Sequence, residues 1–114
     1  KAMTKLTVEQ ITKLQKEYGV TGTQDGINSG QCWRMEGSVG RFASEMLEAG
    51  VCMLPEERKS DYYGNTVPSR NDLKAGTKGT LLNCQNFWQR VEESDFEAID
   101  ALEATFGVQS ENKE

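Results

Sequence analysis

The sequence contains no histidine. Histidine is the commonest general base, the commonest metal ligand and the usual activator of a nucleophilic side chain. No carboxylate pair and no activated nucleophile stands in a recognisable catalytic pattern in its place. We therefore expect a protein that is not an enzyme and that holds no metal and no cofactor.

Long apolar runs are also missing. No segment is long enough to cross a bilayer, and the N-terminal region lacks the apolar core of a signal peptide. These absences predict a cytoplasmic protein that does not contact a membrane.

Cysteine is scarce and widely spaced. Cys32, Cys52 and Cys84 form no CxxC pair, and their odd number leaves at least one of them without a partner. This pattern argues against a disulfide scaffold and against a zinc site. It favours buried, reduced thiols in a cytosolic protein.

Basic residues are nearly absent from the C-terminal end. Residues 92–114 contain eight acidic residues and one lysine, so the formal net charge of −5 originates there. A nucleic-acid-binding protein usually carries a basic face, and direct nucleic-acid binding is therefore not expected. The acidic end fits either of two roles, simple solubility or docking on a basic groove of a partner protein.

The 114 residues indicate one domain with a single small core. We expect a helical domain over residues 1–108, in which Lys1 and Ala2 are cloning remnants before a native start at Met3. Residues 109–114 are expected to form a disordered tail.

Capping residues and apolar spacing predict a mainly α fold. We expect about four helices in a small single-domain bundle, with a short strand or hairpin inserted between the second and third helices. The first expected helix begins at a Thr7–Gln10 capping box and ends at Gly19, and the second begins after an N-cap at Ser29 and ends at Gly50. The third begins after Thr80 and ends at Val91, and the fourth begins at a capping box formed by Ser94 and Glu97 and ends at Gly107.

The segments between these helices are expected to be irregular or extended. Residues 19–30 are rich in glycine and polar residues and predict a loop that can include one helical turn around Gln24 to Ile27. Residues 51–54 predict one short strand. Gly64-Asn65 predicts a tight hairpin turn between strands at Tyr62-Tyr63 and Thr66-Val67.

The expected helix over residues 31–50 carries two neighbouring stripes. The first is apolar and consists of Cys32, Met35, Val39, Phe42 and Met46. The second is almost free of side chains in its middle and consists of Trp33, Gly37, Gly40, Ser44 and Leu47. The sequence leaves open whether residues 29–37 are helical from the start or enter as a strand.

Glycine inside a helix costs roughly 1 kcal/mol relative to alanine, so the second stripe indicates close packing of another helix or a partner. We predict a partner-binding face with Trp33 as its anchor, since tryptophan and arginine dominate interface energies. The predicted partner-binding residues are Trp33, Gly37, Gly40, Arg41 and Ser44. The alternatives are that Trp33 belongs to the core, or that this face seals a symmetric homodimer.

A second candidate site lies in the expected hairpin. Tyrosine and arginine side chains together can stack on a nucleotide and neutralise its phosphates. The candidate ligand-binding residues are Arg58, Lys59, Tyr62, Tyr63 and Arg70. The same residue types also suit a protein contact, or a plain surface loop pinned by its tyrosines.

The central half of the chain carries a resemblance. The phrases MEGSVGR (35–41), LEAGVCMLP (47–55), DYYGNTVPSR (61–70) and GTKGT (76–80), in this order, resemble small uncharacterised proteins encoded by tailed bacteriophages. Small phage proteins of this kind often bind and divert a host enzyme or a defence complex, or sequester a signalling nucleotide. The resemblance thus implies an accessory protein in the cytoplasm of an infected bacterium, and it carries no residue roles.

Our leading functional hypothesis is a non-enzymatic binding protein that inhibits a host or defence protein complex. The alternative is a module that sequesters a small ligand or nucleotide through the hairpin. A third class is a structural protein associated with the virion.

Overall fold

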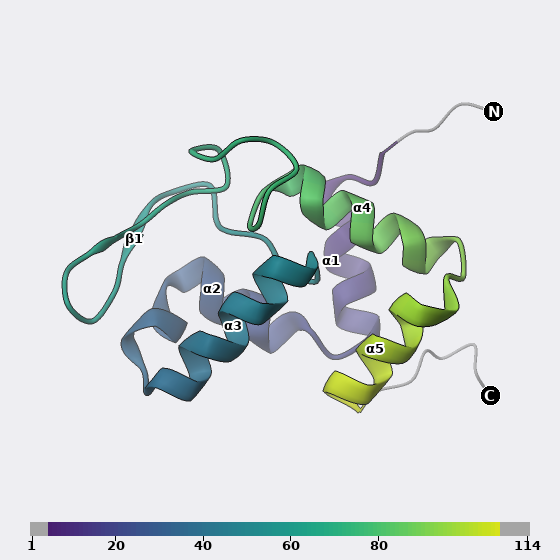
Figure 1. Ribbon diagram of the computed structural model, residues 1–114, viewed down its shortest axis with the longest axis horizontal. Helices are drawn as coiled ribbons and strands as arrows, with labels where there is room; N and C mark the ends of the chain where they lie inside the picture. The colour runs from purple at the N-terminus through teal and green to yellow at the C-terminus, as the bar shows by residue number, and fades with distance from the viewer. Residues whose placement is uncertain (1–4, 108–114) are drawn as a thin grey trace.

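The structure, a computed structural model, describes residues 5–107. This part of the chain is mainly helical and includes one two-stranded hairpin, as expected. The elements in chain order are α1 (Val8–Glu17), α2 (Thr21–Ser29), the 3-10 helix η1 (Gln31–Arg34), α3 (Gly37–Ala49), β1 (Lys59–Ser60), β2 (Thr66–Val67), α4 (Leu81–Glu92) and α5 (Phe96–Phe106). The hairpin extends from one end of the 44 Å long axis, and α4 and α5 form the other end (Figure 1). The expected tail over residues 109–114 and the first two residues lie outside the described part.

Side-chain caps define the starts of three helices. At α1 the predicted capping box is complete, because Thr7 Oγ1 accepts from the Gln10 N–H (3.1 Å) and Gln10 Oε1 accepts from the Thr7 N–H (2.8 Å). Thr80 caps α4, also as predicted. The predicted capping box of Ser94 is wrong: Asp95 caps α5, and Ser94 occupies a left-handed corner (φ 63°) that turns the chain from α4 into α5.

The segment over residues 19–30 is not a loop but contains α2. Its composition is unfavourable for a helix, yet Val20 and Ile27 are completely buried and Gln24 lies between them on the same face. Burial of this face outweighs the low helix propensity of its glycines and threonines. The described part therefore has five α-helices rather than about four, and the hairpin lies between α3 and α4.

The predicted continuous helix over residues 31–50 is also wrong. The chain forms η1, becomes extended at Met35 and Glu36, and starts α3 at Gly37. Ser29 is the last residue of α2 rather than an N-cap, because Gly30 adopts a left-handed conformation (φ 83°) that ends α2. The break removes Met35 from the predicted apolar stripe and leaves its side chain 52% exposed.

Residues 51–55 cross the core without forming the predicted strand. All five residues are buried, so the backbone polar groups of this segment need partners inside the protein. Two buried glutamines supply several of these partners. Gln24 accepts from the Met53 N–H (3.0 Å) and donates to the Met53 carbonyl (2.7 Å), which reproduces both bonds of a strand partner.

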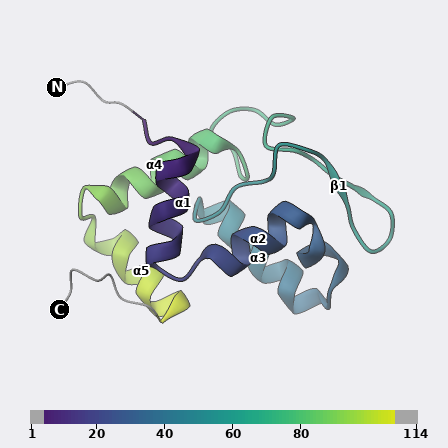
Figure 2. The same ribbon diagram turned by 180° about the vertical axis from the view of Figure 1, so that it is seen from behind.

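Gln15 extends this network. Its Nε2 donates to Gln24 Oε1 and to the Val51 carbonyl, both at 2.9 Å. Trp88 Nε1 of α4 donates to the same carbonyl (2.9 Å). The buried segment therefore connects α1, α2 and α4, which surround it in two opposite views (Figures 1 and 2).

The hairpin is shorter than predicted at its first strand. β1 and β2 pair antiparallel with Lys59 opposite Val67 and Ser60 opposite Thr66. Tyr62 and Tyr63 lie in the turn and not in a strand.

No helix of the described residues is long and apolar enough to span a membrane.

Candidate functional site

The hairpin ends in a five-residue turn, Asp61–Asn65, which we call the tyrosine turn. The Asp61 carboxylate accepts from the backbone N–H groups of Tyr63 (2.9 Å) and Asn65 (2.8 Å), and Asn65 Nδ2 donates to it as well (3.3 Å). The Asp61 N–H also donates to the Asn65 carbonyl (2.9 Å). Gly64 has a φ of 84°, which explains the glycine at this position. The turn backbone is therefore fixed by its own residues.

The two tyrosine side chains point away from this fixed backbone. Tyr62 is 73% exposed and Tyr63 is 83% exposed. Their rings contact each other edge to face, with centroids 5.2 Å apart and an interplanar angle of 89°. The turn thus presents an ordered aromatic pair to solvent.

The tyrosine turn is attached to η1. The Tyr62 N–H donates to the Trp33 carbonyl (3.2 Å), although the two residues are far apart in the sequence. This bond brings together Trp33, the predicted anchor of one candidate site, and the tyrosines of the other. We call Trp33, Tyr62 and Tyr63 the aromatic end of the molecule.

Trp33 is half-buried and packs against the core, and α3 positions it. A Cβ at Gly40 would lie 3.8 Å from Trp33 Cε3 and 3.6 Å from the Cys32 carbonyl oxygen. Gly40, which is partly exposed, therefore lies next to η1 of the same chain. Trp33 Nε1 is buried and has no hydrogen-bond partner among the described residues.

The other predicted partner-binding residues lie on α3, where Gly37, Arg41 and Ser44 have the spacing of one helical face with Gly40. Gly37 and Arg41 are exposed on the first turn of α3, where a Cβ at Gly37 would lie 2.9 Å from Arg41 Nη1. Ser44 accepts a hydrogen bond from Lys78 Nζ in the segment before α4.

The predicted ligand-binding cations lie at the base of the hairpin and are engaged within the chain. Arg58 donates to both carboxylate oxygens of Asp72, at 2.8 and 3.1 Å. The hydrogen bonds from Arg58, and to a lesser extent the hydrogen bond from the Ser69 N–H, hold the pKa of the Asp72 carboxyl group well below its usual range. Arg70 Nε donates to the Leu54 carbonyl (2.7 Å), and the Lys59 side chain covers Gly30.

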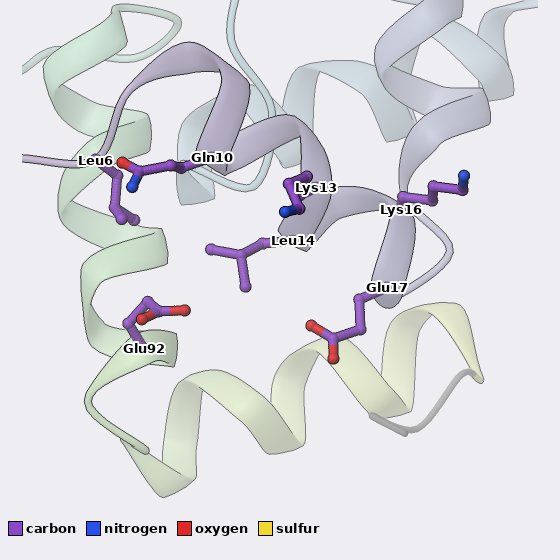
Figure 3. A pocket seen from close by; sticks show the side chains of 7 residues that line it. All are labelled: Leu6, Gln10, Lys13, Leu14, Lys16, Glu17 and Glu92. Atoms are coloured by element: carbon purple, nitrogen blue, oxygen red, sulfur yellow. The ribbon is translucent and has the colours of Figure 1, made fainter. Parts of the chain in front are cut away.

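An open depression of about 630 Å³ lies beside α1. Figure 3 shows Leu14 pointing into its middle, with Glu17 and Glu92 on separate sides and Lys13 and Lys16 above. Its chemistry is mixed and includes no nucleophile paired with a base. Within residues 5–107, no three histidine, cysteine or acidic side chains are grouped closely enough to hold a metal ion.

Burial makes the three thiols unreactive. It raises the pKa of Cys32 to about 11 and that of Cys84 to about 12, and it raises the pKa of Cys52 further. A thiol must ionise to act as a nucleophile or a metal ligand. Burial therefore disfavours the thiolate form of all three cysteines in the folded chain.

Comparison of the chain with protein-family models, with curated proteins and with solved structures found no match. The assignment of a functional surface therefore depends on the geometry alone. Sequence reasoning missed the contact between Trp33 and the tyrosine turn, because no local pattern encodes a bond across such a separation. It also missed the role of Asp61, although an Asp at the start of a turn commonly accepts from the backbone N–H two residues later.

Proposed function

We propose that this chain is a non-enzymatic binding protein that contacts another protein through its aromatic end. The observation that carries the proposal is the combination of exposure and order in the tyrosine turn. Together with Phe96, Tyr62 and Tyr63 are the most exposed large hydrophobic side chains of the described residues, yet the backbone beneath the two tyrosines is held by the Asp61 carboxylate and by η1.

This combination favours binding for an energetic reason. Association costs free energy when loops and side chains must become ordered, about 0.5–1.5 kcal/mol for each immobilised side chain. A turn that is already ordered avoids much of this cost. Tyrosine adds a large contact area with only two side-chain torsions, which is why it is frequent in binding loops.

A protein partner fits the aromatic end better than a nucleotide does. A nucleotide site needs cations beside the stacking rings. Arg58 and Arg70, which the sequence offered for this purpose together with Lys59, are bonded to Asp72 and to the Leu54 carbonyl. A phosphate would have to compete with these bonds for the two guanidinium groups.

The resemblance to small phage proteins supports a more specific form of the proposal. In that form the chain inhibits a host or defence protein complex by occupying part of its surface. The projecting shape of the hairpin suits a concave surface on the partner, which the aromatic pair would enter (Figure 1).

The test is a tagged pull-down from nuclease-treated bacterial lysate with three forms of the chain. We expect the wild type to retain one partner in stoichiometric amount, and the double variant Tyr62→Ser/Tyr63→Ser to lose it. The matched control is Phe96→Ser, because Phe96 is 77% exposed and lies on α5, away from the hairpin. This control should retain the partner.

Two outcomes would contradict the proposal. Retention of the partner by the tyrosine double variant, or its loss only in Phe96→Ser, would move the binding surface away from the aromatic end. A rise in melting temperature with mono-, di- or cyclic nucleotides, abolished by the tyrosine substitutions, would instead establish the nucleotide-binding alternative.

A further inference from the structure

Two exposed arginines belong to the same end of the molecule as the tyrosine turn. Arg34 is the last residue of η1 and follows Trp33, whose carbonyl accepts from the Tyr62 N–H (3.2 Å). Arg41 lies near the start of α3, directly after Gly40, which lies next to the Trp33 ring. In two opposite views, the start of α3 and the hairpin lie at one end of the long axis (Figures 1 and 2).

Neither of these arginines is used inside the chain. Within residues 5–107, no hydrogen bond and no ion pair engages the side chain of Arg34 or Arg41. Arg58, Arg70 and Arg90 are instead bonded to a carboxylate or to a backbone carbonyl of their own chain. The guanidinium groups that remain open to another molecule are therefore those beside the aromatic end.

The acidic side chains at this end are less available. The Asp61 carboxylate accepts from two backbone N–H groups of its turn and from the Asn65 side chain. Glu36 accepts from the Ser38 hydroxyl (3.0 Å), and the next acidic residue of α3, Glu45, lies one turn beyond Arg41. The aromatic end therefore offers two unengaged cations and carboxylates that are already hydrogen-bonded.

The opposite end of the molecule carries most of the negative charge. The acidic residues at the end of α4 and along α5 are Glu92, Glu93, Asp95, Glu97, Asp100 and Glu103, and the only basic residue of α5 and its preceding turn is found in α4, as Arg90. Arg90 pairs with Asp95 (3.0 Å). An acidic partner is repelled by this end, and its approach is oriented toward the aromatic end.

The residue types of the aromatic end suit a contact that combines charge with apolar area. Tryptophan, tyrosine and arginine are the residues that most often dominate the binding energy of an interface. Met35, which follows Arg34 and is 52% exposed, adds a flexible apolar side chain. A guanidinium group binds a carboxylate through two parallel N–H···O bonds, which adds geometric specificity.

We infer that the protein partner presents an acidic segment to the aromatic end. Carboxylates of this segment pair with Arg34 and Arg41, and its apolar side chains pack against Tyr62, Tyr63 and Met35. The inference rests on the proposed function, to which it adds the chemistry of the partner.

The test is fluorescence anisotropy with two labelled peptides, one of repeated Glu-Glu-Phe units and one in which glutamine replaces every glutamate. We expect the full chain to bind the acidic peptide at concentrations below about 1 mM and the glutamine peptide at least about tenfold more weakly. Because the chain has a formal net charge of −5, its net charge cannot produce this preference. Added salt should reduce the difference between the two peptides.

Charge variants locate the contact. Arg34→Glu and Arg41→Glu should each weaken binding of the acidic peptide by about tenfold or more, and Arg34→Lys should weaken it less, since lysine keeps the charge. The matched control is Lys13→Glu, which makes the same change of charge at an exposed position on α1 and should leave a smaller effect. The circular dichroism spectrum of each variant controls for folding.

Three outcomes would overturn the inference. These are equal affinity for the two peptides, no binding of the acidic peptide up to about 1 mM, or an equal loss in Lys13→Glu and the two arginine variants. Tighter binding of oligothymidylate than of the acidic peptide, lost in the same arginine variants, would overturn it in favour of a phosphate ligand.

The pull-down separates failure of this inference from failure of the proposed function. If Tyr62→Ser/Tyr63→Ser loses the partner and Arg34→Glu/Arg41→Glu retains it, the proposed function stands and the acidic segment is wrong. If the tyrosine double variant retains the partner, the proposed function itself fails.

Discussion

At the scale of single residues, two glutamines determine how the polar backbone of the core is satisfied. Gln15 and Gln24 are almost completely buried, and their amide groups form hydrogen bonds to one another and to the backbone of Val51 and Met53. An amide side chain offers both a donor and an acceptor, and a buried backbone segment needs both. A purely apolar core at these positions would leave the segment unpaired.

Replacing Gln24 by alanine is expected to destabilise the fold by about 3 kcal/mol or more. The substitution leaves the Met53 N–H and carbonyl without partners, and each buried unsatisfied group costs roughly 1–3 kcal/mol. Urea unfolding followed by circular dichroism measures the change. Gln31→Ala is the control, because Gln31 is exposed, and its effect should stay within about 0.5 kcal/mol. A loss below about 1 kcal/mol for Gln24→Ala would contradict this account.

At the scale of elements, the sequence predicted those helices whose ends are marked by caps. α1 and α4 begin at their predicted threonine caps, because this signal is local and depends on a few adjacent residues. The apolar spacing of its residues was sufficient to predict α5 as well. Its predicted N-cap, Ser94, was wrong by one residue, since Asp95 is the cap.

Elements that depend on distant contacts were not predictable in the same way. α2 is stabilised by buried contacts of Val20 and Ile27 and by the bond of Gln24 to Met53, which follows 29 residues later. The break at Met35 depends on the packing of η1 against α3. Tyr62 and Trp33 were each identified as candidate site residues, but their proximity depends on a bond that only the fold creates.

The base of the hairpin is an element whose contribution to stability should depend on pH. Arg58 holds the pKa of Asp72 below its ordinary value, near 4 in unfolded chains. The Arg58–Asp72 pair therefore stabilises the fold at a pH above about 4. Its contribution is lost as the pH falls below this value and Asp72 becomes protonated in the folded chain. The stability difference between the wild type and Asp72→Asn should be present at pH 7 and should shrink progressively as the pH falls below about 4.

Urea unfolding of both proteins over this pH range tests the expectation. The difference will be small, because the Arg58 side chain is 68% exposed and water screens the pair. Glu57→Gln is the control, as Glu57 is exposed and forms no ion pair within the described residues. A difference that grows as the pH falls would show that the sign assigned to this pair is wrong.

At the scale of the whole molecule, the segment over residues 51–55 connects α1, α2 and α4 through shared hydrogen bonds. It bonds to α1 and α2 through the glutamines and to α4 through Trp88, and the Leu54 N–H bonds to the Gly79 carbonyl. Cys52 within the segment and Cys84 on α4 are completely buried. Exposure of these thiols should therefore require the entire fold to open.

Thiol labelling should accordingly report global unfolding. At pH 8 we expect Ellman's reagent to react with Cys52 and Cys84 together in urea and far more slowly in the native chain, since burial raises the pKa of both thiols. The free energy derived from native labelling rates should equal that from urea unfolding, about 5–15 kcal/mol for a small domain. Fast labelling of one cysteine without urea would instead reveal local opening of its element.

The bonds between Gln24 and Met53 also determine which kinds of sequence change the fold tolerates. Gln24 contacts the backbone of residue 53 through hydrogen bonds that are independent of that residue's side chain, so other apolar residues of similar volume can replace Met53. An insertion or deletion of one residue between Gly50 and Pro55 has a different effect, because it presents the wrong backbone groups to Gln24 and Gln15. Relatives of this chain should therefore vary in composition across this segment but keep its length constant.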